Sequence, residues 1–195
     1  MNAESGTRSR TRRAILDAAS SVLARDRRAP VAAIAKAADV GRSTLHRYFP
    51  DREQLVLTAA LDSLEMIDGA VRDAATDEGA PAEAMRRLTT ALVGLGDRLL
   101  FVFGDPQLIE EVAAEEGGEG DVEPLVLALI SRGQLEGVFD SGVSAEWIMQ
   151  VLWAMVYAGA EAAQRGTVPR HGVTAHVIRT LERGILAPEA NGTGP

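Results

Sequence analysis

The side chains with the clearest capacity for chemistry lie together in residues 42–48, which read RSTLHRY. Arg42 is the best candidate for reading a base, because a guanidinium can donate to guanine O6 and N7 together. Ser43 and His46 fall on the same side of a helix and could read bases less stringently, and Arg47 could reach a base or a phosphate. This chemistry suits a helix lying in the major groove of DNA.

Two further side chains in this segment suit a positioning role. Thr44 and Tyr48 each carry one hydroxyl, which can hold a phosphate and fix register on DNA but conveys little sequence information. Leu45 and Phe49 stand four residues apart, so one side of the segment is apolar and should pack into a core. The segment therefore predicts a short helix with one buried side and one basic, polar side.

A preceding helix and a tight turn should hold this segment in place. Four apolar side chains before it recur at helical spacing: Val31, Ile34, Ala35 and Ala38. The run Asp39-Val40-Gly41 then interrupts the pattern, because Asp tolerates a left-handed backbone and Gly adopts one at no steric cost. Residues 30–49 are therefore predicted to form a helix-turn-helix.

Charge is distributed unevenly along the chain, although the total of −8 is unfavourable for DNA binding. Residues 1–52 contain eleven Lys or Arg and five Asp or Glu, a net charge of +6, and residues 53–195 carry the remaining −14. Such asymmetry is typical of nucleic-acid binding, since the basic part can meet phosphates while the acidic part is repelled. The alternative, a packing hairpin whose polar face meets only solvent, does not account for this coincidence.

At these residues the chain resembles the TetR family of bacterial transcriptional regulators. The segment DVGRSTLHRYFPDREQL resembles the family signature, in which a Thr-Leu pair, two variable recognition residues and Tyr-Phe precede a basic-acidic pair. Upstream residues match the first two helices of the family: Ile15, Leu16, Ala18, Ala19, Ile34 and Ala35. The resemblance spans about residues 11–55 and implies a DNA-binding regulator in which Arg52 contacts a phosphate.

The loop before the helix-turn-helix departs from this family pattern. Family members place a Gly and an aromatic residue there, followed by a Thr or Ser that caps the next helix. Residues 26–30 of this chain read DRRAP, which is shorter and lacks those residues. Pro30 falls at or near the first helical turn, where proline is tolerated.

Hydrophobic periodicity predicts an all-α protein with two parts. Residues 1–10 are polar and arginine-rich, and are expected to form a flexible basic arm that either reaches a phosphate or minor groove or only solubilises the terminus. Residues 11–52 should form a three-helix DNA-binding domain, and residues 53–186 a helical effector-binding and dimerisation domain. Residues 187–195 should form a disordered tail.

In the family, the C-terminal helices form a homodimer and enclose a pocket whose small-molecule effector releases the operator; the resemblance implies the same here. Residues 147–157 are apolar nearly all round a helix, so a second subunit could cover one side. Aromatic and Met residues suit an adaptable pocket, although at helical spacing they also build an ordinary core. The candidate lining residues are Met66, Met85, Phe101, Phe103, Trp147, Met149, Trp153 and Tyr157.

Catalysis finds little support in the sequence. The chain has no cysteine, no phosphate-cradling glycine loop and no nucleophile-elbow pattern. His171 and His176 are five residues apart and would diverge on a helix, so we expect neither a metal nor another cofactor. The longest nearly apolar stretch, residues 147–160, is shorter than the ~20 residues that span a bilayer. We therefore expect a soluble, cytoplasmic protein without a membrane partner.

The preferred hypothesis is a homodimeric repressor, not an enzyme, that binds a near-palindromic double-stranded DNA operator and is released by an unknown small-molecule effector. An activator or dual regulator of the same fold remains open. So do two other classes: a helical interaction protein without DNA binding, and a small-molecule-binding enzyme.

Overall fold

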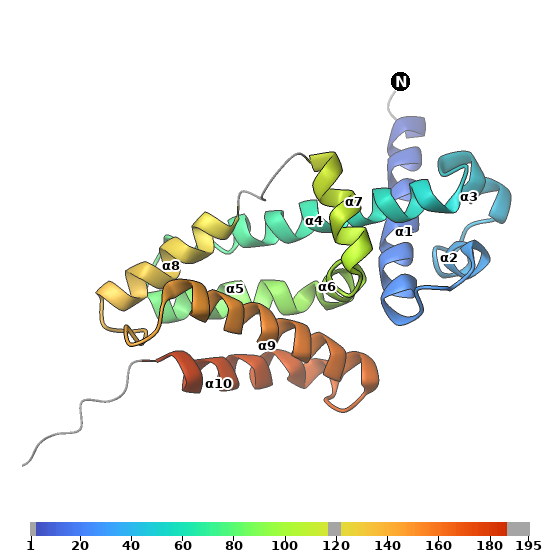
Figure 1. The fold of residues 1–195 in the computed structure, drawn as a ribbon. Helices are drawn as coiled ribbons and strands as arrows, with labels where there is room; N and C mark the ends of the chain where they lie inside the picture. The colour runs from blue at the N-terminus through green and yellow to red at the C-terminus, as the bar shows by residue number, and fades with distance from the viewer. Residues whose placement is uncertain (1–2, 117–121, 187–195) are drawn as a thin grey trace, which may run out of the picture. The chain divides into compact units, whose positions relative to one another are not determined.

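The computed structural model describes residues 3–116 and 122–186, and these residues are built from α-helices, which confirms the predicted all-α class (Figure 1). Within them a 3₁₀ turn covers Arg170–Gly172 and a β-bridge joins Phe139 to Leu186. None of the described helices is both long and apolar enough to cross a membrane. The helices are α1 Ala3–Arg25, α2 Val31–Ala37, α3 Arg42–Tyr48, α4 Arg52–Asp73, α5 Pro81–Gly94, α6 Gly96–Phe103, α7 Pro106–Glu116, α8 Glu123–Leu135, α9 Ala145–Arg165 and α10 Val173–Ile185.

The helices gather into two compact units. Unit one comprises Met1–Ile67 and Asp97–Glu119, and unit two comprises Asp68–Gly96 and Gly120–Pro195. Helices α6 and α7 therefore pack with the N-terminal helices, although the predicted division put them in the part after residue 52. How function divides between residues 11–52 and 53–186 stays a prediction, and the predicted tail 187–195 lies outside the described residues.

Unit one has one apolar core to which each of its helices contributes. The side chains that recur at helical spacing in the sequence are the ones that meet there. They are Ile15, Leu16, Ala19 and Leu23 of α1, Ile34 and Ala35 of α2, Leu45 of α3 with Phe49 after it, Leu55 and Ala59 of α4, Phe101 and Val102 of α6, and Leu108 and Val112 of α7.

The first helix is longer than the sequence analysis predicted. We expected a flexible arm over residues 1–10 and helical structure only from residue 11, where the three-helix domain was predicted to begin, whereas α1 begins at Ala3. The Thr11 hydroxyl donates to the Thr7 carbonyl at 3.0 Å, and Arg10 donates to the Thr7 hydroxyl at 3.2 Å. An established helix adds one hydrogen bond for each residue it gains, so α1 can extend without an apolar face.

Unit two contains α5, α8, α9 and α10, and α9 packs against the other three (Figure 1). Helix α10 buries a row of apolar side chains at i, i+4 spacing: Val173, Val177, Leu181 and Ile185. Two glycines allow close packing, because a Cβ at Gly133 would lie 2.2 Å from the Phe139 ring and one at Gly159 would lie 2.5 Å from Val177.

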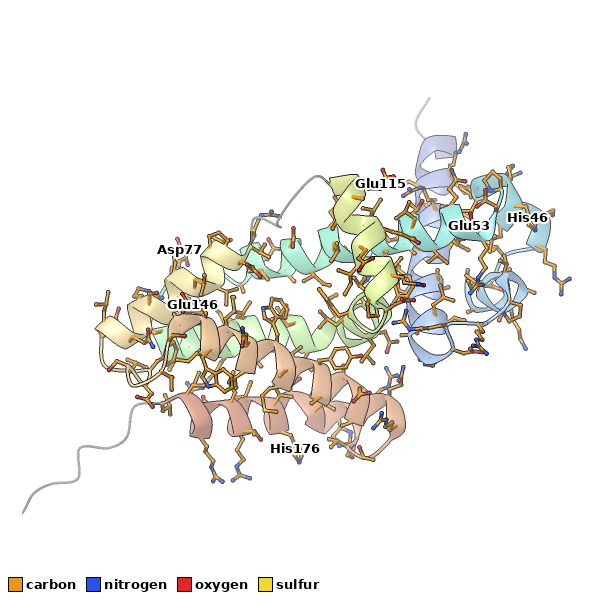
Figure 2. The ribbon with its side chains drawn as sticks, viewed as in Figure 1. His46, Glu53, Asp77, Glu115, Glu146 and His176 are labelled. Carbon is orange, nitrogen blue, oxygen red and sulfur yellow. The ribbon has the colours of Figure 1, made fainter. Side chains whose placement is uncertain are left out.

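Helix α9 begins at Ala145, with Ser144 as its N-cap. The Ser144 hydroxyl accepts a hydrogen bond from the Trp147 amide at 3.2 Å, which satisfies one of the unpaired amides at a helix start. The pKa of Glu146, labelled in Figure 2, is lowered because its own backbone amide donates to the carboxylate and the Ser144 side chain bonds to it as well.

Candidate nucleic-acid interface

Helices α2 and α3 and the turn between them form the predicted helix-turn-helix. Asp39 takes the left-handed backbone of the turn, with φ of 53°. Gly41 is extended instead, with φ of −68° and ψ of 150°, and serves as the N-cap of α3. Its role is therefore to begin the recognition helix, while Asp39 supplies the reversal.

The side chains of α3 divide by exposure into three groups. The proposed base readers Arg42, Ser43, His46 and Arg47 are exposed, and the proposed phosphate anchors Thr44 and Tyr48 are half-buried. Leu45 and Phe49 are only 1% and 3% exposed and belong to the core of unit one. This division gives the exposed face of the helix the basic, hydrogen-bonding character that major-groove reading requires.

The ring of His46 is oriented by a backbone carbonyl just beyond the end of α3. Its Nδ1 lies 3.3 Å from the Pro50 carbonyl oxygen (His46 is labelled in Figure 2). A carbonyl only accepts, so Nδ1 must carry the proton in this hydrogen bond. In the tautomer with the proton on Nδ1, Nε2 is an acceptor, which suits the amino groups of adenine or cytosine in the major groove.

Arginines from two helices surround the Tyr48 ring. The guanidinium carbons of Arg8 on α1 and Arg47 on α3 lie 6.0 and 5.8 Å from the ring centroid, and that of Arg12 lies 5.8 Å from the Phe49 ring. Cations over aromatic faces at such distances are attracted by the ring quadrupole. The extended start of α1 thus adds Arg8, and the next turn of the helix adds Arg12, to the positive surface at the end of α3.

Arg52 points into the protein. Its two terminal nitrogens donate to the carbonyl oxygens of Ala29 and Arg27, at 2.5 and 2.6 Å. The resemblance implied a phosphate contact for this residue. In this structure two of the five guanidinium donors hold the loop between α1 and α2, and the phosphate contact stays a prediction.

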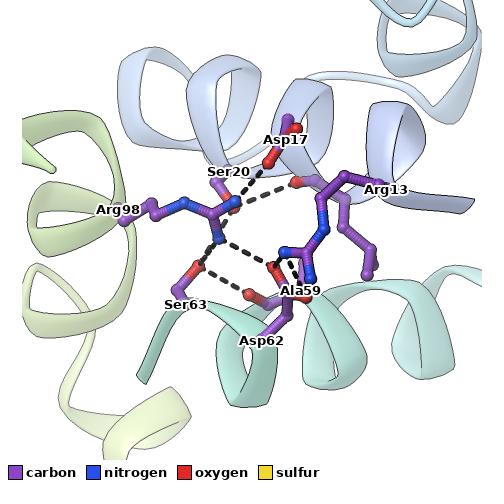
Figure 3. A network of polar contacts seen from close by, with 8 residues as sticks. Arg13, Asp17, Ser20, Ala59, Asp62, Ser63 and Arg98 are labelled. Atoms are coloured by element: carbon purple, nitrogen blue, oxygen red, sulfur yellow. Dashed lines mark hydrogen bonds and ion pairs between the residues drawn. The ribbon is translucent and has the colours of Figure 1, made fainter. Parts of the chain in front are cut away.

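A polar network with a buried centre ties α1 and α4 to α6. Arg98 of α6 donates to Asp62 and Ser63 of α4 at 2.9 and 3.1 Å, and also bonds to Asp17 of α1 (Figure 3). Arg13 of α1 forms a second ion pair with Asp62 at 2.7 Å. Two arginines and two carboxylates balance in charge, so α1, α4 and α6 are joined without a net buried charge.

None of the residues in this network is among the site residues predicted from the sequence. Arg98 is 8% exposed and Asp62 7%, yet both sit in helices whose pattern marks only apolar faces. An arginine at a buried position of an amphipathic helix is the one signal that could have found the site, because charges are rarely buried without partners.

The predicted effector-lining residues differ in exposure and are divided between the two units. Met85, Phe101 and Met149 are buried, Trp153 and Tyr157 are half-buried, and Met66, Phe103 and Trp147 are exposed. Met66, Phe101 and Phe103 belong to unit one and the other five to unit two. Of the eight, Phe101 lines a hollow of about 250 Å³ in unit one, and the pocket assignment stays a prediction.

Among the described residues, no three or more His, Cys, Asp or Glu side chains are grouped to hold a metal ion. His171 and His176 are exposed, and the His176 Nδ1 lies 2.7 Å from the Gly172 carbonyl of its own segment.

Comparison with known proteins groups this chain with DNA-binding regulators. Residues 15–59 match the family of bacterial regulatory proteins described as the tetR family. The chain is 39% identical over 187 residues to the HTH-type transcriptional repressor LfrR of Mycolicibacterium smegmatis, with 94% of each protein covered. It is 25% identical over 166 residues to the HTH-type transcriptional regulator NfxB of Pseudomonas aeruginosa, covering 84% of this chain and 86% of NfxB.

Solved structures share the same helical arrangement. The crystal structure of LfrR from Mycobacterium smegmatis in complex with proflavine matches with a TM-score of 0.71 at 34% identity, covering 93% of this chain and 99% of LfrR. The ketosteroid transcriptional regulator KstR2 of Mycobacterium tuberculosis matches with a TM-score of 0.66 at 16% identity, covering 91% of this chain and 95% of KstR2, a likeness of fold alone.

Proposed function

The chain belongs to the TetR family of bacterial regulatory proteins, and we propose that it is a homodimeric repressor that binds a near-palindromic operator and is released by a small-molecule effector. As its relatives are transcriptional regulators, it is a DNA-binding regulator and not an enzyme. The observation that carries the proposal is the division of α3, which exposes four potential base-reading side chains while Leu45 and Phe49 anchor the helix.

We assign the contacts on DNA from side-chain chemistry and exposure. Arg42 reads guanine, Ser43 and His46 read neighbouring bases, and Arg47 reaches a base or a phosphate. The half-buried hydroxyls of Thr44 and Tyr48 hold phosphates. Arg8 and Arg12 add positive charge beside Tyr48 and Phe49, which favours the phosphate backbone without selecting a sequence.

The support for a homodimer is an apolar surface on α8 and α9 of unit two. Trp147 is 56% exposed and begins a row on α9 that continues through Val151, Ala154 and Ala158. On α8, Leu125 and Leu135 are 37% and 90% exposed. Exposed apolar side chains on two helices that pack together are typical of protein interfaces, and this surface is the one we assign to the second subunit.

Two-fold symmetry of such a dimer would present two copies of α3 to the DNA. A dimeric helix-turn-helix protein binds two half-sites related by the same symmetry, which is the reason for proposing a near-palindromic operator.

The support for an effector comes from a relative. LfrR binds proflavine in its crystal structure and matches this chain over 93% of its length. We propose that this chain also binds a small molecule, in a pocket lined by some of the eight aromatic and Met candidates. Such a ligand releases the operator only if it binds the DNA-free state more tightly than the DNA-bound state.

DNA binding is tested by fluorescence anisotropy with labelled fragments of the region upstream of the protein's own gene, at several salt concentrations. We expect one fragment to bind much more tightly than a scrambled one of the same composition. Its affinity should fall steeply with salt, with a logarithmic slope of about −0.9 per neutralised phosphate. Equal affinity for both fragments would contradict a sequence-specific regulator and favour a helical interaction protein.

Effector binding is tested with proflavine as the probe, on the DNA-free protein. Calorimetry should detect saturable binding, and the same concentration range should release the preformed protein–operator complex. Because a dye can also act on DNA, an unrelated DNA-binding protein on its own site is the control. Release of both complexes alike, without binding to the free protein, would contradict a proflavine-responsive pocket.

Repression is the least direct part of the proposal, since an activator of the same fold would bind DNA through the same face. A reporter driven by the bound promoter separates the two. Deleting the regulator should raise expression if it represses and lower expression if it activates.

A further inference from the structure

The loop between α1 and α2 has few means of its own to hold the helix-turn-helix in place. Its backbone is turned by Asp26, whose carbonyl accepts from the Ala29 amide at 2.9 Å and whose carboxylate accepts from the Arg28 amide at 2.9 Å. Pro30 is the N-cap of α2 and makes no side-chain cap hydrogen bond. The carbonyls of Arg27 and Ala29 therefore need partners from other elements.

Arg52 provides those partners from the first residue of α4. Its two terminal nitrogens reach Ala29 and Arg27 at 2.5 and 2.6 Å, so one planar guanidinium bridges two carbonyls of the loop. A cation at a helix N-terminus is disfavoured by the helix dipole, and the two charged hydrogen bonds offset that cost. A lysine ammonium lacks the fork that spans two acceptors.

Arg27 carries the connection onward to α6 and α7. Its side chain donates to the carbonyls of Leu100 and Phe101 at 3.1 and 3.0 Å, and to the Asp105 carboxylate at 3.0 Å. Helix α6 ends at Phe103, so these carbonyls belong to its last turn, where carbonyls lack helical partners and a cation is favoured. The Arg27 carbonyl thus accepts a hydrogen bond from Arg52 of α4, while the Arg27 side chain donates hydrogen bonds to α6.

We infer that the hydrogen bonds of Arg52 and Arg27 form a connected chain, here called the relay, that positions the helix-turn-helix. Arg52 acts through this relay and not as a phosphate contact. The relay runs from α4 through the α1–α2 loop to the end of α6, all within unit one. It fixes where α2 begins, and α2 carries α3 through a short turn. This inference rests on the proposed DNA binding for its effect on operator affinity, but the contacts themselves exist in the free protein.

The first test is the thermal unfolding of the DNA-free protein. Arg52→Met and Arg27→Met should each lower the midpoint by roughly 4–8 °C, since each removes hydrogen bonds made by a charged group. Arg52→Lys keeps the charge but not the fork, and should lower the midpoint almost as much as Arg52→Met. Arg28→Met is the matched control, because Arg28 is exposed in the same loop, and it should leave the midpoint unchanged.

The second test is the salt dependence of operator affinity for the same variants. Loss of the relay should weaken binding roughly tenfold or more at each salt concentration while leaving the slope unchanged. Loss of a phosphate contact should instead flatten the slope by about 0.9 for each DNA-binding domain of the dimer. It should leave the unfolding midpoint unchanged, and Arg52→Lys should restore the affinity.

A flattened salt slope, an unchanged unfolding midpoint and rescue by Arg52→Lys would together overturn the inference for Arg52. An Arg27→Met protein indistinguishable from Arg28→Met would overturn it for Arg27. Lowered midpoints with operator affinity intact would show that the loop contacts stabilise the fold without positioning α3, which also overturns the relay. If the wild-type protein bound no operator, the proposed function would fail, whereas the unfolding test would still report whether the two arginines hold the loop.

Discussion

Arg98 of α6 and Asp62 of α4 form an ion pair at 2.9 Å with side chains that are only 9% and 6% exposed. Asp62 also pairs with Arg13 of α1, whose side chain is 47% exposed. The two arginines thus contact one carboxylate from very different environments. Burial, more than the number of ion pairs, should decide which of them stabilises unit one.

Replacing Arg98 with Met should lower the free energy of unfolding by about 3 kcal/mol, because removal of one partner leaves buried polar groups uncompensated. Arg13→Met should cost less than about 1 kcal/mol, as is usual for an exposed pair. Denaturant unfolding of both variants checks the difference. Equal losses would mean that exposure does not govern the network.

Replacing Arg42 with Ala should weaken operator binding by about 1–3 kcal/mol and relax the preference at one base position in each half-site. The reason is that Arg42 is exposed at the first residue of α3, where its guanidinium can reach a base edge. Affinities for a set of operators with single-base changes measure the effect. Lys36→Ala, an exposed change on α2, is the control and should leave the base preferences intact.

Replacing Tyr48 with Phe should weaken binding to operators of different sequence by nearly the same factor, because only the hydroxyl is lost. The ring and its contacts with Arg8 and Arg47 remain, so thermal stability should not change. Anisotropy against several operators, together with thermal unfolding, checks both expectations. A loss of affinity that depends on the base would indicate that Tyr48 contacts a base edge and not the DNA phosphate backbone.

Replacing Trp147 with Glu should shift the protein toward monomer, since a charge would replace an apolar side chain in the proposed interface. Trp147 is 56% exposed in the single chain, so the fold should tolerate the change. Sedimentation velocity over a concentration series measures the shift. Ala175→Glu, an exposed position on α10, is the control; a dimer unaffected by Trp147→Glu would place the interface elsewhere.

Replacing Gly133 with Ala should destabilise unit two by about 1–3 kcal/mol, because overpacking forces neighbours to move and the new Cβ would lie 2.2 Å from the Phe139 ring. Gly184→Ala has nothing within 4 Å of its Cβ and should stabilise α10 by about 0.5–1 kcal/mol, since Ala favours a helix over Gly. Opposite signs in denaturant unfolding are the expected result.

The helix-turn-helix could be predicted from the sequence because its information is local. The four-residue spacing of Leu45 and Phe49 determines which side of α3 is buried, and the remaining side chains are thereby exposed. The buried row of α10, from Val173 to Ile185, has the same four-residue spacing. Within a helix, the spacing of the apolar residues is enough to predict which face is buried.

The partners of the arginines were decided by the tertiary structure. Arg98 lies 36 residues from Asp62, and Arg52 lies 23 residues from Ala29, and no period connects such positions. A guanidinium has donors for any acceptor in reach, so packing determines whether it meets a phosphate, a carboxylate or a loop carbonyl. The sequence by itself therefore determined which face of α3 is exposed, and only the tertiary structure decided that Arg52 and Arg98 hold unit one together.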